Sequence, residues 1–144
     1  MEDDVVSEGC GWLVLDHPAD VMIEITGDTF LDLCRNAARG LNHFLGEIVS
    51  EQPAQTERLK IEGDTLEEQL VNLLRELLFH FVRTSTLVTN LSLSNHDDKM
   101  LMFEAFFQPA QVGPNSLEVK GITYHGLSVE KNSQGYVARL VFDV

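Results

Sequence analysis

Two acidic segments near opposite ends of the chain hold the residues best suited to bind a cation. They are Asp16-His17-Pro18-Ala19-Asp20 and Phe142-Asp143-Val144. In the first segment the proline biases the histidine before it away from helix, so we expect an irregular but ordered connection between two strands. Carboxylates on such a connection suit a hard cation such as Ca²⁺ or Mg²⁺, which takes several oxygen ligands. Loop aspartates also cap turns, and for the first segment alone this alternative stays open.

The second segment ends the chain directly after a core-like strand. Residues 140–142 are Leu-Val-Phe, and they lead into Asp143 and the free α-carboxylate of Val144. Two negative groups would then stand at a fixed sheet edge, where a metal, a lysine or an arginine of a partner could compensate them. The alternative is a solvent-exposed end that needs no partner.

The sequence contains none of the common signatures of catalytic or nucleotide-binding sites. It contains no GxSxG, GxxxxGK[ST], GxGxxG or HExxH motif. Cys10 and Cys34 form no CxxC pair, and we expect both to be reduced thiols. Among the five histidines, only His17 and His125 flank the segments of interest; the other three are expected to be structural or to lie in a turn. A small metal-dependent hydrolase using Asp16, Asp20 and His125 is disfavoured, because no nucleophile or base stands out.

The secondary-structure elements that must position these residues begin with a strand–turn–helix pattern that occurs twice. Short strands at residues 12–15 and 21–25 precede Gly27-Asp28-Thr29 and a helix whose apolar residues recur every three or four positions from Phe30 to Leu45. A strand at 59–62, Gly63-Asp64-Thr65 and a second amphipathic helix follow, with Thr65 and Glu68 as a capping box. Gly-Asp-Thr could be a ligand loop, but a tight turn with a helix N-cap is the favoured interpretation.

The second half of the chain is predicted to be strands. They are expected at 87–93, 100–107, 118–125, 127–131 and 136–143, with turns at 95–98 and 132–135 and a loop at 108–116. The prediction is an α/β (α+β) two-layer sandwich, with a mixed, mainly antiparallel sheet of about seven strands and two main helices on one face. Residues 1–10 are expected to be disordered or frayed, and residues 11–144 to form a single domain.

Composition limits the range of functions. The chain has 144 residues, with 23 acidic and 10 basic side chains and a net charge of -13. Such a chain repels phosphate backbones, so strong direct nucleic-acid binding is not expected, whereas a cation or a basic partner surface would be attracted. No apolar run reaches the roughly 20 residues of a membrane span, and the acidic start lacks a signal-peptide pattern, so a cytoplasmic location is expected. The sequence leaves the oligomeric state undetermined.

Five segments in order resemble the archease family, over nearly the whole length of the chain. They are residues 16–21 (DHPADV), 27–29 with 36–41 (GDT and NAARGL), 63–68 (GDTLEE) with the leucine-rich helix, 119–125 (VKGITYH) and 142–144 (FDV). Pro18 stands where the family usually has threonine, Gly121 replaces the usual alanine, and the second helix lacks the family's tryptophan.

The resemblance implies a function. Archeases are small two-layer α/β proteins that are not enzymes themselves but protein cofactors of the RtcB-type RNA-splicing ligase. They promote ligase guanylylation and multiple turnover in tRNA splicing and RNA repair. The resemblance places a metal site at Asp20, Asp143 and the carboxylate of Val144, and a functional lysine at Lys120, with Asp16, His17 and His125 as neighbours. Ca²⁺ is the first choice of metal, with Mg²⁺ or Mn²⁺ as alternatives. The rival function is a general chaperone or modulator of an RNA-modifying enzyme such as a tRNA methyltransferase.

Overall fold

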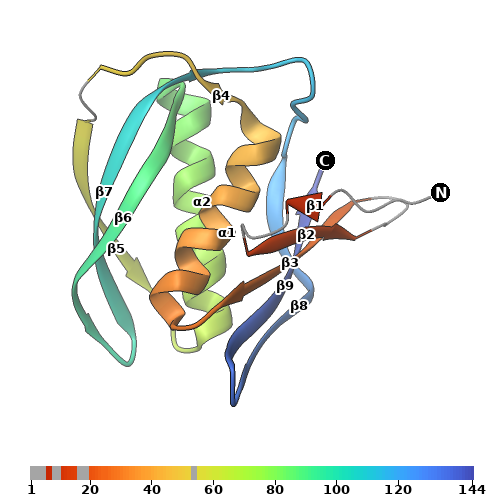
Figure 1. Cartoon of the computed structure of the whole chain (residues 1–144). Coiled ribbons are helices and arrows are strands. Elements are labelled where there is room, and N and C mark those ends of the chain that lie inside the picture. The colour runs from red at the N-terminus through yellow and green to blue at the C-terminus, as the bar shows by residue number, and fades with distance from the viewer. Residues whose placement is uncertain (1–5, 8–10, 16–19, 53–54) are drawn as a thin grey trace.

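The computed structural model describes residues 6–7, 11–15, 20–52 and 55–144, which form two helices and nine strands (Figure 1). The helices are α1 (Phe30–Leu45) and α2 (Leu66–Thr84). The strands are β1 (Val6–Ser7), β2 (Trp12–Leu15), β3 (Val21–Gly27), β4 (Glu47–Ile48), β5 (Gln55–Glu62), β6 (Thr86–Asp97), β7 (Met100–Gln111), β8 (Gly121–Asn132) and β9 (Gly135–Asp143).

The strands divide between two sheets, and neighbouring strands are antiparallel. The first sheet has the order β1-β2-β3-β9-β8. In the second, β7 pairs with β4, β5 and β6. The predicted α+β class, the two helices and the antiparallel pairing are confirmed, and the strand number rises from about seven to nine.

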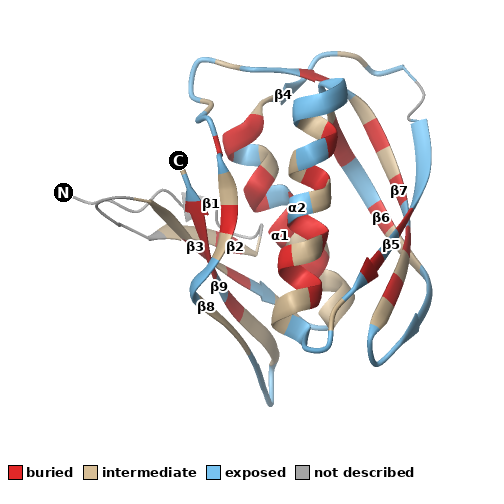
Figure 2. Cartoon of the chain, turned by 180° about the vertical axis from the view of Figure 1, so that it is seen from behind, coloured by how far each residue is buried: buried red, intermediate tan, exposed pale blue. Residues whose placement is uncertain are grey.

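Both helices lie between the two sheets, which refines the expected placement on one face of a single sheet (Figure 1). Helix α1 contacts β3 of the first sheet and β6 of the second, and α2 contacts β8 as well as β5 and β6. The buried residues face inward from both sheets and along the helices, so one core fills the space between them (Figure 2). Within the described ranges, no helix is long and apolar enough to cross a membrane.

Each Gly-Asp-Thr segment forms a turn and a helix cap, as predicted. The Thr29 Oγ1 accepts a hydrogen bond from the Asp32 N–H at 3.1 Å, and the Thr65 Oγ1 accepts one from the Glu68 N–H at 3.1 Å. The Glu68 carboxylate in turn accepts a hydrogen bond from the Asp64 N–H at 3.1 Å. This completes the predicted capping box, although the usual donor is the N–H of the N-cap residue, here Thr65. These side-chain oxygens satisfy N–H groups that have no partner within the helix.

Some predicted boundaries in the strand region are wrong. Residues 95–97 belong to β6, and the turn before β7 narrows to Asp98-Lys99. Residues 121–132 form one strand, β8, instead of two, with a shift of register between Thr123 and Ser128. The pairing partner decides these boundaries, because a long partner strand holds polar residues in a ladder that their own propensity would not sustain.

Of residues 1–10, expected to be frayed, only Val6–Ser7 lie within the described residues. They form β1, which pairs with Leu13 and Trp12 of β2.

Candidate functional site

The register between β3 and β9 brings the two acidic segments of the sequence together. Val21 pairs with Phe142, and the ladder continues inward to Gly27 and Tyr136. Asp20 precedes β3 directly and Asp143 is the last residue of β9, so both stand one position beyond the Val21–Phe142 pair. Residues opposite one another in such a ladder have Cα atoms roughly 5 Å apart. The residues at opposite ends of the sequence therefore meet at one end of the first sheet, here called the acidic end (Asp20, Asp143, Val144).

Lys120 joins the acidic end from the other side of β9. Gly121 of β8 pairs with Asp143, and the Lys120 N–H donates a hydrogen bond to the Asp143 carbonyl at 2.6 Å. The Lys120 and Asp143 side chains are both exposed, whereas Asp20 and Val144 are partly buried. The lysine that the family resemblance singles out is thus the neighbour of the predicted cation ligands.

An arginine that sequence reasoning missed fixes the start of β8. Arg75 lies on α2, and its Nε and Nη2 donate hydrogen bonds to the Ile122 carbonyl at 3.2 and 2.9 Å. Its guanidinium also lies 5.0 Å from the centre of the Tyr124 ring. The available signal was a charged residue within the leucine-rich stretch of the helix, because a guanidinium there can donate to backbone carbonyls of a neighbouring element.

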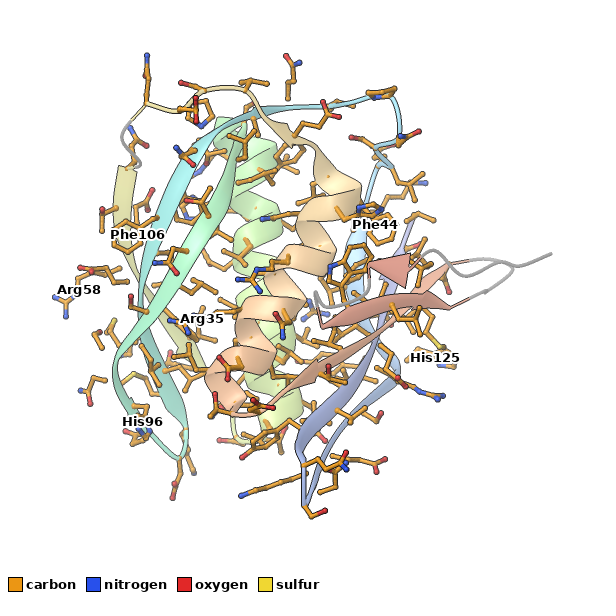
Figure 3. The ribbon with its side chains drawn as sticks, viewed as in Figure 1. Arg35, Phe44, Arg58, His96, Phe106 and His125 are labelled. Carbon is orange, nitrogen blue, oxygen red and sulfur yellow. The ribbon has the colours of Figure 1, made fainter. Side chains whose placement is uncertain are left out.

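Aromatic packing against α1 anchors the end of β9. Phe142 is fully buried, and its ring meets the Phe44 ring edge-on with centroids 6.0 Å apart. Phe44 also contacts the rings of Trp12 and His43. Figure 3 labels Phe44 in the C-terminal half of α1. Because Phe142 is held in the core, the adjacent Asp143 and Val144 are held at the end of a strand that is paired on both sides.

The donor set at the acidic end fits a hard divalent cation. Two aspartate side chains and one α-carboxylate offer oxygens alone, which is the ligand type that Ca²⁺ and Mg²⁺ take. Within the described ranges, no three His, Cys, Asp or Glu side chains cluster as a metal site. Asp20 and Asp143 supply two carboxylates, and the third ligand that the family resemblance implies is the α-carboxylate of Val144.

Three other residues are predicted neighbours of the acidic end. Asp16 and His17 lie outside the described residues. His125 is exposed on β8 within the register shift, and its N–H donates a hydrogen bond to the Thr123 Oγ1 at 2.9 Å. It lies on the side of the first sheet that faces away from the helices (Figure 3).

The remaining histidines and the described cysteine occupy structural positions. His43 packs against the Trp12 ring at 4.6 Å, and the buried His80 stacks on Phe107 at 4.4 Å. His96, expected in a turn, lies in β6. Burial raises the pKa of the Cys34 thiol to about 12, so this cysteine stays protonated and unreactive at neutral pH. Cys10 lies outside the described residues.

A polar groove of about 740 Å³ lies at the opposite end of the β3–β9 ladder, roughly 20 Å away at strand spacing. It is lined by Arg35 and Arg39 of α1, by Asp28 and Asp32, and by the start of β9. The Arg35 Nε donates to the Leu91 carbonyl at 2.9 Å, and the Arg39 Nη1 donates to the Asn36 Oδ1 at 2.9 Å. The two arginines of the groove are already engaged in these hydrogen bonds, and their charges are matched by those of Asp28 and Asp32. The candidate chemistry therefore stays with the acidic end.

The sequence was compared with models of known protein families. Residues 12–144 match the model of the Archease protein family (MTH1598/TM1083). The chain belongs to the archease family. Archease relatives include one from Methanopyrus kandleri, 27% identical over 143 residues, covering 92% of this chain and 99% of the relative. An archease from Danio rerio is 25% identical over 130 residues, covering 83% of this chain and 77% of the relative.

Solved archease structures share the fold. The solution structure of Methanobacterium thermoautotrophicum protein 1598 superposes with a TM-score of 0.72 at 20% identity, covering 94% of this chain and 99% of that one. The crystal structure of an archease from Thermotoga maritima, described there as a possible chaperone, gives a TM-score of 0.64 at 16% identity, covering 90% of this chain and 94% of that one.

Proposed function

We propose that this member of the archease family holds a divalent cation at the acidic end and activates an RtcB-type RNA-splicing ligase. The ligase carries out the chemistry, and the archease promotes its guanylylation and repeated turnover in tRNA splicing and RNA repair. One observation carries the proposal: the β3–β9 register sets Asp20 beside Asp143 and the chain terminus, with Lys120 adjacent.

The cation would be held by Asp20, Asp143 and the α-carboxylate of Val144, with Ca²⁺ as the first choice and Mg²⁺ or Mn²⁺ as alternatives. When bound, it would offer positive charge and free coordination positions to oxygen atoms of a partner. The Lys120 N–H holds the Asp143 backbone in place through its bond to the carbonyl. Rigid backbone at this point would keep the carboxylates in position without ordering a loop on binding.

The net charge of -13 supports a protein partner with a basic surface over direct capture of RNA. An acidic surface would be drawn to a ligase active site that handles phosphates and divalent cations, and would be repelled by free RNA. This proposal places the protein in the cytoplasm.

The decisive experiment measures transfer of labelled GMP to the ligase with and without the archease. Asp20→Asn and Asp143→Asn each remove one charge at the acidic end, and we expect at least a tenfold loss of stimulation. Asp98→Asn, in the exposed turn between β6 and β7, is the matched control and should stimulate like the wild type. Full stimulation by both acidic-end variants would refute the proposal.

A second measurement tests the chain terminus. Residues appended after Val144 convert its carboxylate to an amide, so calorimetric affinity for Ca²⁺ should fall by at least tenfold. An equal extension at the N-terminus is the control. Unchanged affinity in the C-terminal extension would remove Val144 from the ligand set while leaving the aspartates in it.

A general chaperone or modulator of an RNA-modifying enzyme is the second candidate. The exposed apolar side chains of Val82 and Val112 favour it, as does the description of the Thermotoga maritima relative. This function predicts suppression of client aggregation that is the same in EDTA and in Ca²⁺. The ligase proposal predicts stimulation that EDTA-treated protein loses.

A further inference from the structure

An apolar groove lies between the last turns of α2 and the segment that joins β7 to β8. Its volume is about 180 Å³, and we call it the α2 groove. The apolar residues that line it include Leu78, Phe81, Val82, Val112, Leu117 and Val119. Figure 2 shows the last turn of α2 exposed beside β4.

The rim of the α2 groove exposes more apolar surface than folding of the chain alone would favour. Val82 is 72% exposed and Val112 is 68% exposed. Phe79 on α2 and Ile48 on the adjoining strand β4 are 51% and 42% exposed. β4 pairs with the end of β7, directly before Val112. Val82 and Val112 line the same groove, and an apolar groove with such exposed lining is typical of interaction sites in soluble proteins.

The α2 groove is continuous with the acidic end through four residues of chain. The Leu117 N–H donates a hydrogen bond to the Phe44 carbonyl at 2.8 Å, which fixes the groove wall to the end of α1. Val119 is buried in that wall, and the next residue, Lys120, is bonded to Asp143. In Figure 1 this segment runs into β8 beside the chain's C-terminus. A partner that touches the acidic end can therefore cover the groove as well.

Charge selects the class of occupant. Glu118 stands on the groove wall, and Glu47 packs against the same segment at Gly113. The Arg83 guanidinium is held over the Phe79 ring at 4.8 Å. A second copy of a chain with net charge -13 would bring two acidic surfaces together, whereas a basic partner would be attracted.

We infer that the α2 groove docks a protein partner whose contact surface carries apolar side chains flanked by lysine or arginine. Resting on the proposed function, that partner is the ligase, and the groove supplies affinity while the acidic end supplies activation. An apolar centre surrounded by a charged rim is the usual composition of protein interfaces.

The test replaces three exposed groove residues together: Val82→Ser, Val112→Ser and Leu117→Ser. Binding to the ligase is measured by calorimetry, and guanylylation is followed as a function of archease concentration. We expect at least a tenfold weaker Kd, with the plateau of guanylylation at saturation within twofold of the wild type. Asp143→Asn should instead lower the plateau. Leu66→Ser, 38% exposed in the first turn of α2, is the matched control and should bind like the wild type.

Circular dichroism and the thermal midpoint check that the triple variant folds, and the single Val82→Asp variant serves if it does not. If the wild type binds and stimulates the ligase and the folded groove variant binds it with equal affinity, the docking inference alone is overturned. A wild type that neither binds nor stimulates overturns the proposed function and the docking inference with it. A wild-type dimer that the groove variant dissociates in sedimentation would assign the groove to a second copy and also overturn the inference.

Discussion

The two strand–turn–helix units, β3–α1 and β5–α2, are built from the same local signals. Equivalent residues lie 36 positions apart, as in Gly27 and Gly63. In each unit a side-chain amide on the helix donates to the last strand residue before the glycine: Asn36 Nδ2 to the Thr26 carbonyl and Asn72 Nδ2 to the Glu62 carbonyl, both at 2.7 Å. With the threonine caps, this makes Gly-Asp-Thr a repeated structural device.

The units differ at the far ends of their strands. β3 begins beside the end of β9, where Asp20 and Asp143 meet. β5 begins at Gln55, opposite Phe107, and its partner strand continues beyond that point to pair with β4. The same turn and cap thus carry two strands into different surroundings. The candidate site therefore depends on which strand pairs with β3, and the Gly-Asp-Thr turn, which both units share, only orients the helix.

The largest difference between the units is expected at the glycines. A Cβ at Gly27 would collide with the backbone nitrogen of Leu33 and lie 2.8 Å from the Asp32 carbonyl carbon, whereas at Gly63 the nearest atom is the Gln69 nitrogen at 2.8 Å. Overpacking against backbone costs about 1–3 kcal/mol. We expect Gly27→Ala to cost about 3 kcal/mol and Gly63→Ala about 1 kcal/mol in urea unfolding.

Gly121→Ala is the control for both glycine variants, because no atom lies within 4 Å of its added Cβ. Its unfolding free energy should stay within about 0.5 kcal/mol of the wild type. Equal costs at Gly27 and Gly63 would show that the two turns are equally tight in solution.

The next effect concerns Cys34 of α1, whose counterpart in α2 is Leu70; both are fully buried. Burial raises the pKa of the Cys34 thiol from 9.0 to about 12, so above pH 9 the unfolded chain loses a proton that the folded chain keeps. Stability from this group is intact below pH 9 and is lost as pH rises toward 12, by about 1.4 kcal/mol per pH unit.

Urea unfolding between pH 8 and pH 11 checks the cysteine prediction, with Cys34→Ala as the comparison. The variant should lack this share of the pH dependence, although it is less stable at pH 8. Parallel pH curves for the two proteins would mean that the thiol reaches solvent in the folded state.

A smaller effect is expected at the helix caps. Thr29→Ala and Thr65→Ala each remove one side-chain acceptor, at a cost of about 1 kcal/mol. The Thr65 hydroxyl also lies 3.4 Å from the Glu68 carboxylate, so Thr65→Ala should cost slightly more. Serine at either position keeps the acceptor and should recover most of the loss. Denaturant unfolding of all four variants decides this; no recovery by serine would assign the effect to the methyl group.

The smallest effect on stability is expected at the acidic end. Without divalent cations, Asp143→Asn removes one negative charge from an exposed side chain, so stability should change by less than about 0.5 kcal/mol. Thermal unfolding in EDTA at low salt measures the change, with Asp98→Asn as the control. A loss of more than about 1 kcal/mol would make Asp143 a structural residue of the fold.

Local signals account for most of the helical half of the molecule. The predicted spacing of apolar residues from Phe30 to Leu45 matches α1 to the residue, because helix periodicity and capping depend on neighbours within four positions. The apolar spacing of the second helix extends from Leu66 to Phe81, whereas α2 continues to Thr84 and is capped by Ser85, which adopts a left-handed conformation (φ 55°). Serine carries no strong signal for that conformation, so the exact end escaped prediction.

The sequence by itself determined the two helices, their caps, the core-like strand before Asp143 and the surplus of negative charge. Through resemblance it also marked Asp20, Asp143, Val144 and Lys120 as one candidate site. Only the tertiary structure decided that β3 pairs with β9 in the register that sets Asp20 beside Asp143, and that the strands form two sheets around the helices. Strand pairing joins residues more than a hundred positions apart, and its register is selected by burial of whole faces, which no local pattern encodes.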